Sequence, residues 1–404
     1  MSTYISVEKD CPAPEPFGDN IGKLTAITAL FFLSFLGQFV FAPLIPTIEN
    51  DLGISHAQAG SLFLMMSIGA FISQVLSGHL SFRINHRGSM FVSKLLVGLP
   101  LLWLLIDSSL LSLRVVTLIV GMGLGLHIPS AIATITAMVD RNDWGKALGL
   151  HETAPPLGMA IIPFLVVILL NYLAWQHIIA VIAIIVIAPS FFIYQFCDCG
   201  NFPGDPPVRQ LLFEVLRLRS FWIMVVLFAL YFSGVVGLYT MYSLYLIQEA
   251  GISADLANSL VGLSRLTGLI GVFISGFLMD RIGEKKHIFL VMGMAGLATI
   301  LIGTTSGVVL MVMIFIQAAL INCFPAAGFS ALSRTVQPHL RSVVTSFATP
   351  IAIVIGAGIV PIFLGFMGEN YSFSTGIIVI GCLILVSPFL VLPLRLLDVL
   401  GDGC

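Results

Sequence analysis

Charged residues are scarce in this sequence. Asp, Glu, Lys and Arg make up only 9% of its 404 residues, whereas 58% are hydrophobic. Soluble domains carry about 25% charged residues, so the charges present here are too few to cover a water-exposed surface. The composition therefore excludes an ordinary soluble domain and predicts an all-α protein that crosses a membrane several times.

The sequence also lacks the motifs of catalysis and cofactor binding. It contains no glycine-rich nucleotide loop, no pattern typical of a nucleophilic triad and no cluster of metal ligands. We therefore expect neither an enzyme nor an ATP-driven pump, and we expect no cofactor, no bound metal and no nucleic-acid partner.

The six cysteines show no paired spacing of the kind found in disulfide-rich extracellular domains. Four of them fall in segments that we assign to the cytoplasm, where structural disulfides are rare. The pair Cys197-Asp-Cys199 could hold a soft metal, but no further Cys or His stands nearby to complete a site.

Long apolar runs account for most of the chain. A bilayer core of about 30 Å is crossed by a helix of about 20 apolar residues, and twelve runs reach that length. The predicted spans are 23–46, 56–80, 88–107, 112–138, 146–171, 173–196, 219–246, 257–279, 286–304, 307–333, 341–366 and 372–396.

The longest interruption between these runs divides them into six and six. Residues 197–218 are rich in Gly and Pro and then become amphipathic, so we expect a cytoplasmic linker with a short surface helix. The expected domains are six-helix bundles at 22–196 and 219–404. Residues 1–21 are polar and carry no cleavable signal peptide, which predicts a disordered cytoplasmic tail.

The basic residues indicate the orientation. With the N-terminus inside, sixteen of the eighteen Lys and Arg residues, Lys94 among them, fall at or near the cytoplasmic side. Only Arg114 and Arg265 do not. This asymmetry follows the positive-inside rule and predicts a multi-pass protein of the cell (inner) membrane with both termini in the cytoplasm.

One charged loop carries a family resemblance. The stretch Gly276-Phe-Leu-Met-Asp280-Arg281-Ile-Gly283-Glu-Lys-Lys286 resembles the G-x-x-x-D-R-x-G-x-[RK]-[RK] loop of the major facilitator superfamily. The resemblance implies two pseudo-symmetric six-helix bundles that rock about a central site. It also implies a secondary transporter that works by alternating access, and we expect a monomer. Gly276, Asp280, Arg281 and Gly283 would then belong to a gating loop.

The first half contains an altered copy of this loop. The shift that lays Gly53-Ile-Ser55 on Gly251-Ile-Ser253 also lays Arg83 on Arg281, so Arg83 joins the expected gating residues. Phe82 stands where the loop has Asp280, and Asn85 stands where it has Gly283. Because phenylalanine cannot accept a hydrogen bond, any conformational lock in this half must be weaker or use other partners.

Glu152 and His127 are the candidate proton carriers. Charges within the hydrocarbon region are costly and are functional candidates by default. We expect Glu152 in the inner third of the membrane, where it either exchanges a proton or pairs with Lys94 or Lys146. His127 lies near the middle of its helix and either relays a proton or is a satisfied core histidine. His151 should point about 100° away from Glu152 around the helix.

Arg265 is the candidate substrate-binding charge. It lies about four helical turns from Asp280, and its planar guanidinium suits a carboxylate or phosphate. The alternative is that it reaches toward the outer surface or bonds to helix carbonyls. Polar residues that could line the cavity or join helices are Ser34, Gln38, Tyr239, Tyr242 and Asn322.

These features predict a secondary transporter for a small solute in the lipid bilayer, with an organic anion as the favoured substrate and protons as the coupling ion. One alternative is a proton-driven exporter of lipophilic or multidrug compounds. Another, from a different class, is a membrane sensor or assembly protein that does not transport. The short loops argue against the latter, because no soluble domain is available to transmit a signal.

Overall fold

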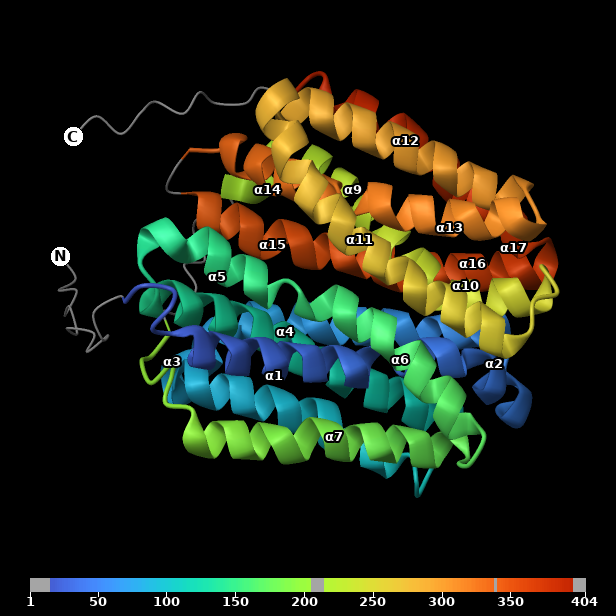
Figure 1. The fold of residues 1–404 in the computed structure, drawn as a ribbon, viewed down its shortest axis with the longest axis horizontal. Helices are drawn as coiled ribbons and strands as arrows, with labels where there is room; N and C mark the ends of the chain where they lie inside the picture. The colour runs from blue at the N-terminus through green and yellow to red at the C-terminus, as the bar shows by residue number, and fades with distance from the viewer. Residues whose placement is uncertain (1–14, 205–213, 338–339, 395–404) are drawn as a thin grey trace.

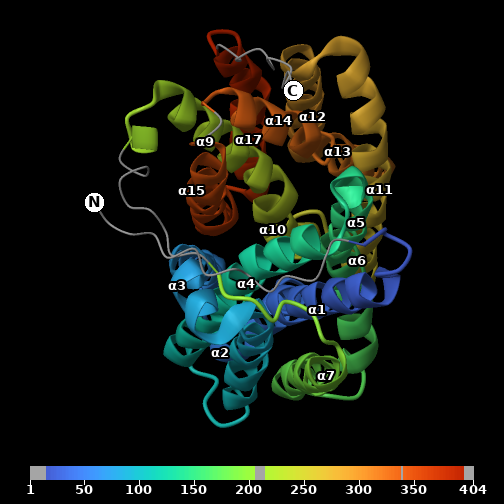
Figure 2. The same ribbon diagram turned by 90° about the vertical axis from the view of Figure 1, so that its left-hand side faces the viewer.

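A computed structural model describes residues 15–204, 214–337 and 340–394. Apart from an isolated bridge between Glu15 and Val139, its regular elements in these ranges are helices. They form two groups that lie one above the other, and the described part of the chain begins, at residue 15, and ends, at residue 394, on the same side of the molecule (Figures 1 and 2).

The lower group in Figure 1 comes from the first half of the chain. Its α1 and α2 run nearly end to end, as do α5 and α6. The bounds are α1 Ile21–Phe39, α2 Phe41–Leu52, α3 His56–Trp103, α4 Leu110–Met138, α5 Trp144–His151, α6 Ala154–Leu170 and α7 Trp175–Phe196.

The upper group comes from the second half. Two of its spans contain a short π-helical stretch, at Ser233–Gly237 between α9 and α10 and at Val354–Ile359 between α15 and α16. The bounds are α9 Arg219–Phe232, α10 Leu238–Gln248, α11 Ala254–Ile282, α12 Glu284–Thr304, α13 Gly307–Ile321, α14 Phe324–Arg334, α15 Arg341–Ile353, α16 Val360–Asn370 and α17 Phe373–Val386, followed by a 3-10 turn at Ser387–Val391.

The described residues confirm twelve membrane-crossing segments. Ten helices or continuous pairs of helices are long and apolar enough to span a bilayer. One of these, α3, contains two spans joined by a sharp kink at Asn85, and α11 supplies a further span of 29 residues. The predicted loop between residues 80 and 88 is therefore only a kink.

Part of the predicted disordered tail is ordered. The Glu15 and Asn20 positions both bond to Met138 at the end of α4, through the Glu15 N–H at 3.1 Å and the Asn20 side chain at 3.1 Å. The Phe17 N–H donates to Asp143 over 3.2 Å. Backbone and side-chain hydrogen bonds thus attach residues 15–20 to the first bundle. Residues 205–213, which include the first half of the predicted amphipathic helix of the linker, lie outside the described residues.

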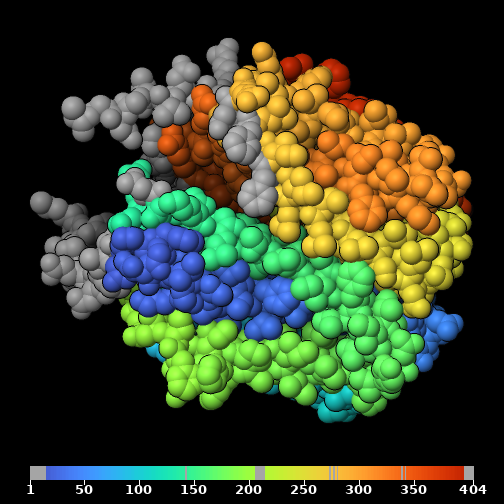
Figure 3. Space-filling view, in the orientation of Figure 1, coloured from blue at the N-terminus to red at the C-terminus, as the bar shows by residue number. Residues whose placement is uncertain are grey.

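The two groups meet tightly at the end far from the termini. A Cβ on Gly60 would lie 2.6 Å from the Pro361 carbonyl oxygen, and one on Gly365 would lie 2.4 Å from the His56 carbonyl oxygen. Only glycine allows α3 and α16 to approach this closely. On the other side, where the termini lie, the surface is hollowed between the two groups (Figure 3). The interior is therefore open toward the termini and closed at the opposite end.

Candidate functional site

Three stacked rings lie inside the first bundle. Phe31 on α1 stacks on His127 of α4 and on His151 of α5, with ring centroids 5.1 Å and 4.3 Å apart. The two imidazoles are 5.9 Å apart and inclined by only 12°. Both histidines are fully buried. In the described part of the chain, neither ring nitrogen of His127 has a hydrogen-bond partner, so the prediction of a satisfied core histidine is not supported.

Glu152 lies at a break in its span rather than inside a continuous helix. The chain leaves α5 at His151 and begins α6 at Ala154, followed by Pro155 and Pro156. Proline has no N–H to continue the preceding helix and is favoured in a first turn. The break at Glu152 corrects the single helix that we predicted over 146–171.

This break also brings His151 and Glu152 into contact. The His151 Nδ1 lies 3.3 Å from Glu152 Oε1, although the His151 side chain is buried and that of Glu152 is 60% exposed. As predicted, the two side chains differ in direction, since one is buried and the other exposed. Their end groups nevertheless touch, which the prediction did not include. Glu152 is also close enough to Tyr231 of α9, in the second bundle, to interact with it electrostatically.

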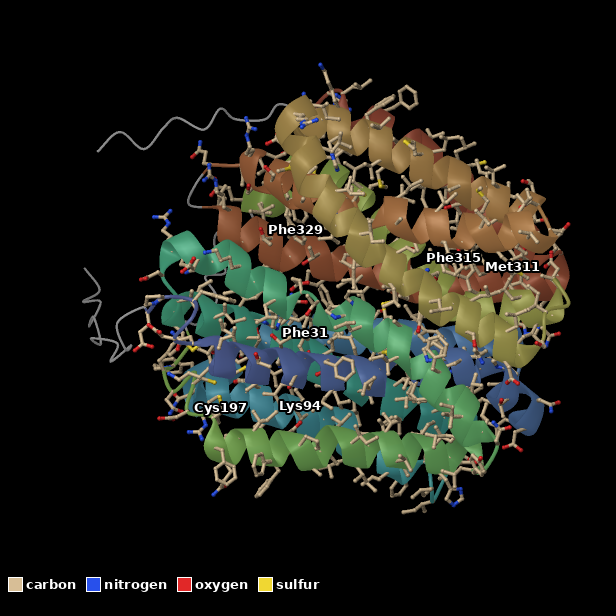
Figure 4. The ribbon with its side chains drawn as sticks, viewed as in Figure 1. Phe31, Lys94, Cys197, Met311, Phe315 and Phe329 are labelled. Carbon is tan, nitrogen blue, oxygen red and sulfur yellow. The ribbon has the colours of Figure 1, made fainter. Side chains whose placement is uncertain are left out.

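Lys94 is a buried cation that the sequence analysis placed near the cytoplasmic surface. It lies nine residues beyond the kink at Asn85, or roughly 13 Å along the helix, and its side chain is fully buried. Its ammonium donates to the Ser34 hydroxyl, which in turn donates to the Leu30 carbonyl over 3.2 Å. Lys94 and Phe31 both belong to the first bundle (Figure 4), and both side chains are buried.

Neither lysine considered as a partner of Glu152 pairs with it in the described ranges. Lys94 bonds to Ser34, and Lys146 bonds to Asp143 over 2.6 Å at the start of α5. The Lys94 ammonium does interact electrostatically with His127. A chain of titratable groups therefore runs from exposed Glu152 to buried Lys94.

Arg265 lies inside the second bundle and is only 2% exposed. Its Nη1 donates to the Val235 carbonyl over 3.2 Å, within the π-helical stretch, and its Nε donates to Ser264 over 3.2 Å. The guanidinium carbon also lies 5.2 Å from the centroid of the Tyr239 ring.

The charge of Arg265 is not neutralised. Its Nη2 and the Tyr242 hydroxyl have no hydrogen-bond partner among the described residues. Tyrosines are its electrostatic neighbours in those ranges, and no carboxylate is among them. Within the described residues, the expected bonding to helix carbonyls is limited to one bond, to Val235, which satisfies only part of the guanidinium. A buried cation without a counter-ion is costly unless something else supplies negative charge.

The other residues predicted to line the cavity differ in their hydrogen-bond partners. The Tyr239 hydroxyl donates to the Met159 carbonyl over 2.9 Å and so joins the two bundles beside Arg265. The Gln38 side-chain oxygen has no partner in the described ranges. Asn322 bonds to Ala318 one turn earlier, over 2.8 Å, and Ser34 supports Lys94.

The two copies of the gating loop share one backbone conformation. Gly283 adopts φ 78° and ψ 159°, and its counterpart Asn85 adopts φ 61° and ψ 170°. Arg83 and Arg281 are both exposed. The structure does not describe the side chain of Asp280 or the packing around Gly276. The altered first copy thus keeps the turn of the second copy without its glycine.

The model of the Major Facilitator Superfamily matches residues 27–349 and 236–400. The chain belongs to this superfamily. It is a multi-pass membrane protein of a family of transporters rather than of enzymes, and the family predicted from the loop at 276–286 is confirmed.

Curated relatives are distant members. A probable hexose phosphate transport protein of Chlamydia trachomatis is 24% identical over 300 residues, which are 64% of this chain and 65% of the relative. The hexuronate transporter of Bacillus subtilis is 24% identical over 65% of this chain and 66% of its own. A probable L-galactonate transporter of Escherichia coli is 22% identical over 89% of this chain and 86% of its own. The chain thus spans about 65% of the length of the first two relatives.

Solved structures share the fold. A nucleoside transporter, NupG, superposes with a TM-score of 0.77 over 91% of this chain and 98% of that one, at 13% identity. A bacterial homologue of the human lysosomal transporter Spinster, in an inward-facing and occupied conformation, gives 0.74 over 94% and 97%, at 15% identity. At these identities the likeness concerns the fold alone.

Proposed function

We propose that this transporter moves small organic anions, of the sugar-phosphate or sugar-acid class, together with protons. The observation that carries the proposal is Arg265, a buried guanidinium with one unpartnered nitrogen and no neighbouring carboxylate in the described ranges. A guanidinium binds a carboxylate or phosphate through two parallel hydrogen bonds. The three relatives above are named for hexose phosphate, hexuronate and galactonate, and each of these solutes carries such a group.

The residues around Arg265 can link anion binding to the relative position of the two bundles. Tyr239 lies against the guanidinium and also bonds to Met159 of the first bundle. Tyr242 adds an unpartnered hydroxyl. An anion that binds Arg265 therefore competes with Tyr239 for the guanidinium, and Tyr239 also joins the two bundles. The binding energy of the anion can thus bias the relative movement of the bundles.

The first bundle supplies the proton pathway in this proposal. Glu152 takes up a proton from the hollow, and His151 contacts its carboxylate. His127 stacks on the same Phe31 ring as His151 and interacts electrostatically with Lys94. Protonation of Glu152 removes a negative charge from the hollow, which favours entry of an anionic solute. Proton and anion thus occupy different bundles that move relative to each other.

We place the protein in the cell (inner) membrane as a monomer with cytoplasmic termini, so the hollow of Figure 3 faces the cytoplasm. The bias of Lys and Arg toward one side of the predicted spans supports this orientation. The bundles correspond to residues 22–196 and 219–404, joined by the linker 197–218.

Uptake into proteoliposomes tests the proposal. Labelled glucose 6-phosphate, glucuronate and galactonate are compared with neutral glucose, with and without an inward proton gradient. We expect accumulation of at least one anion, stimulation by the gradient and no accumulation of glucose. Arg265→Gln should abolish uptake, whereas Arg114→Gln, which removes a charge bonded to Ser61 within the first bundle, should retain it. Efflux of lipophilic cations that survives Arg265→Gln would instead establish the exporter alternative.

A further inference from the structure

A strap of eight residues, 197–204, follows α7 and runs along the kinked part of α3. The Arg87 N–H donates to the Gly200 carbonyl over 2.9 Å, and the His86 N–H donates to Phe202 over 3.3 Å. The Gly204 N–H donates to Ser81 over 3.2 Å. The strap is therefore attached to α3 on both sides of Asn85, outside the membrane-spanning part of α7.

Two thiols meet at the beginning of this strap. The sulfur atoms of Cys197 and Cys199 are 3.4 Å apart, and both residues are partly exposed. They line one small cavity together with Arg87, Met90 and Tyr194. Figure 4 places Cys197 at the end of the molecule where the termini lie. The transport mechanism proposed above uses neither thiol.

Two basic residues, Arg87 and Lys23, lie near enough to act on the pair electrostatically. The Arg87 guanidinium bonds to Asp198 over 3.0 Å and lies 4.9 Å from the centroid of the Tyr194 ring. A hydrogen bond from Cys199, together with the charges of Arg87 and Lys23, lowers the pKa of Cys197 to about 7, although burial and Asp198 oppose this. The same hydrogen bond raises the pKa of Cys199. These opposite pKa shifts favour Cys197 as the thiolate and Cys199 as the thiol that keeps its proton.

We propose that Cys197 and Cys199 form a reversible oxidation site that reacts with hydroperoxides. The Cys197 thiolate attacks one peroxide oxygen, so an S–O bond forms, the O–O bond breaks, and the departing oxygen leaves with the electron pair and takes a proton. Cys199 then attacks the Cys197 sulfur: an S–S bond forms, the S–O bond breaks, and the released hydroxide takes the Cys199 proton to give water. Two thiols are oxidised and one peroxide is reduced.

The geometry favours this pair over the other described cysteines. A resolving thiol already touches the nucleophile, and residues 197–200 have no regular secondary structure that would have to unfold before the sulfur atoms join. Cys323 instead is buried and bonds to the Gly271 carbonyl over 3.1 Å. Cys382 is exposed on α17, within a membrane span.

Peroxide treatment of the purified full-length transporter, with a chelator present, tests the site. Equimolar hydrogen peroxide should remove two hydrogens from the peptide that contains residues 197–199, and dithiothreitol should restore them. The rate should be half-maximal near pH 7, because Cys197 is a thiolate above its pKa. At pH 7 a larger fraction of Cys197 than of an ordinary cysteine is thiolate, but each thiolate is less nucleophilic because its pKa is lower. The net result is that Cys197 should react about threefold faster than an ordinary cysteine.

Three variants separate the roles. Cys199→Ser should stop at a sulfenic acid on Cys197 that dimedone traps, and Cys197→Ser should react no faster than the remaining cysteines. Arg87→Lys keeps a positive charge beside the pair and should keep the reaction, provided that each variant elutes as a folded monomer. Unchanged reactivity in Cys197→Ser, or sulfenic acid without disulfide in the unaltered protein, would overturn the proposal.

Discussion

The Ala57 backbone N–H donates to the Glu369 carboxylate over 2.6 Å. Ala57 lies in the first turn of α3 and Glu369 lies near the end of α16, so this bond joins the two bundles at their closed end. A carboxylate at a helix N-terminus is favourable because the first N–H groups of a helix have no intrahelical partner. The bond must break when this end opens during alternating access.

Glu369→Gln should therefore make the closed end open more readily. Loss of the charged acceptor removes about 1 kcal/mol, or about fivefold in the ratio of closed to open states. Distances between spin labels on the ends of α3 and α16 measure this ratio. Glu249→Gln is the matched control, because Glu249 bonds to the Phe373 N–H over 2.6 Å within the second bundle. An equal shift in both variants would show that the Glu369 bond has no special part in closure.

Asn85→Gly should stabilise the protein. Asn85 occupies a backbone region that is essentially restricted to glycine, which costs a residue with a side chain about 1–3 kcal/mol. Thermal unfolding in detergent should shift upward for Asn85→Gly and downward for the reciprocal Gly283→Asn. A fall in stability for Asn85→Gly would mean that the asparagine side chain makes compensating interactions.

Lys94→Met should separate stability from function. Methionine fills a similar volume without the cost of burying an ammonium, so the melting temperature should rise or stay constant. Proton-stimulated uptake should fall, because Lys94 lies beside His127 at the inner end of the proton pathway. Full retention of proton-stimulated uptake would leave Lys94 with no part in coupling.

Glu152→Gln should uncouple transport from the proton gradient. The amide cannot carry a proton between the two sides, so gradient-driven accumulation should be lost. Exchange of internal for external anion needs no net proton movement and should continue. Counterflow and gradient-driven uptake in the same proteoliposomes measure the two activities. Accumulation that still depends on the proton gradient would exclude Glu152 as the carrier.

The sequence predicted the span count because apolar length is a local property. The loop at 276–286 predicted the family because glycine, acid and base stand at fixed spacing there. The sequence predicted Lys94 too close to the cytoplasmic surface. The depth of a residue in the membrane depends on where the preceding loop ends, and the predicted loop is only a kink at Asn85. It also missed the His151–Glu152 contact, although Pro155 and Pro156 signalled the break that produces it. No sequence pattern indicated the π-helical stretch whose Val235 carbonyl accepts a hydrogen bond from Arg265.

Affinity for the anion at Arg265 tests the account most directly. Binding of the transported anion to purified protein is compared for the unaltered protein, Arg265→Lys and Arg265→Gln. Loss of a charge-assisted bidentate contact costs about 1.5–3 kcal/mol, which corresponds to a Kd about 10- to 100-fold higher for Arg265→Gln. Arg265→Lys should fall between the two. An unchanged Kd in Arg265→Gln would contradict the assignment of Arg265 as the anion-binding group.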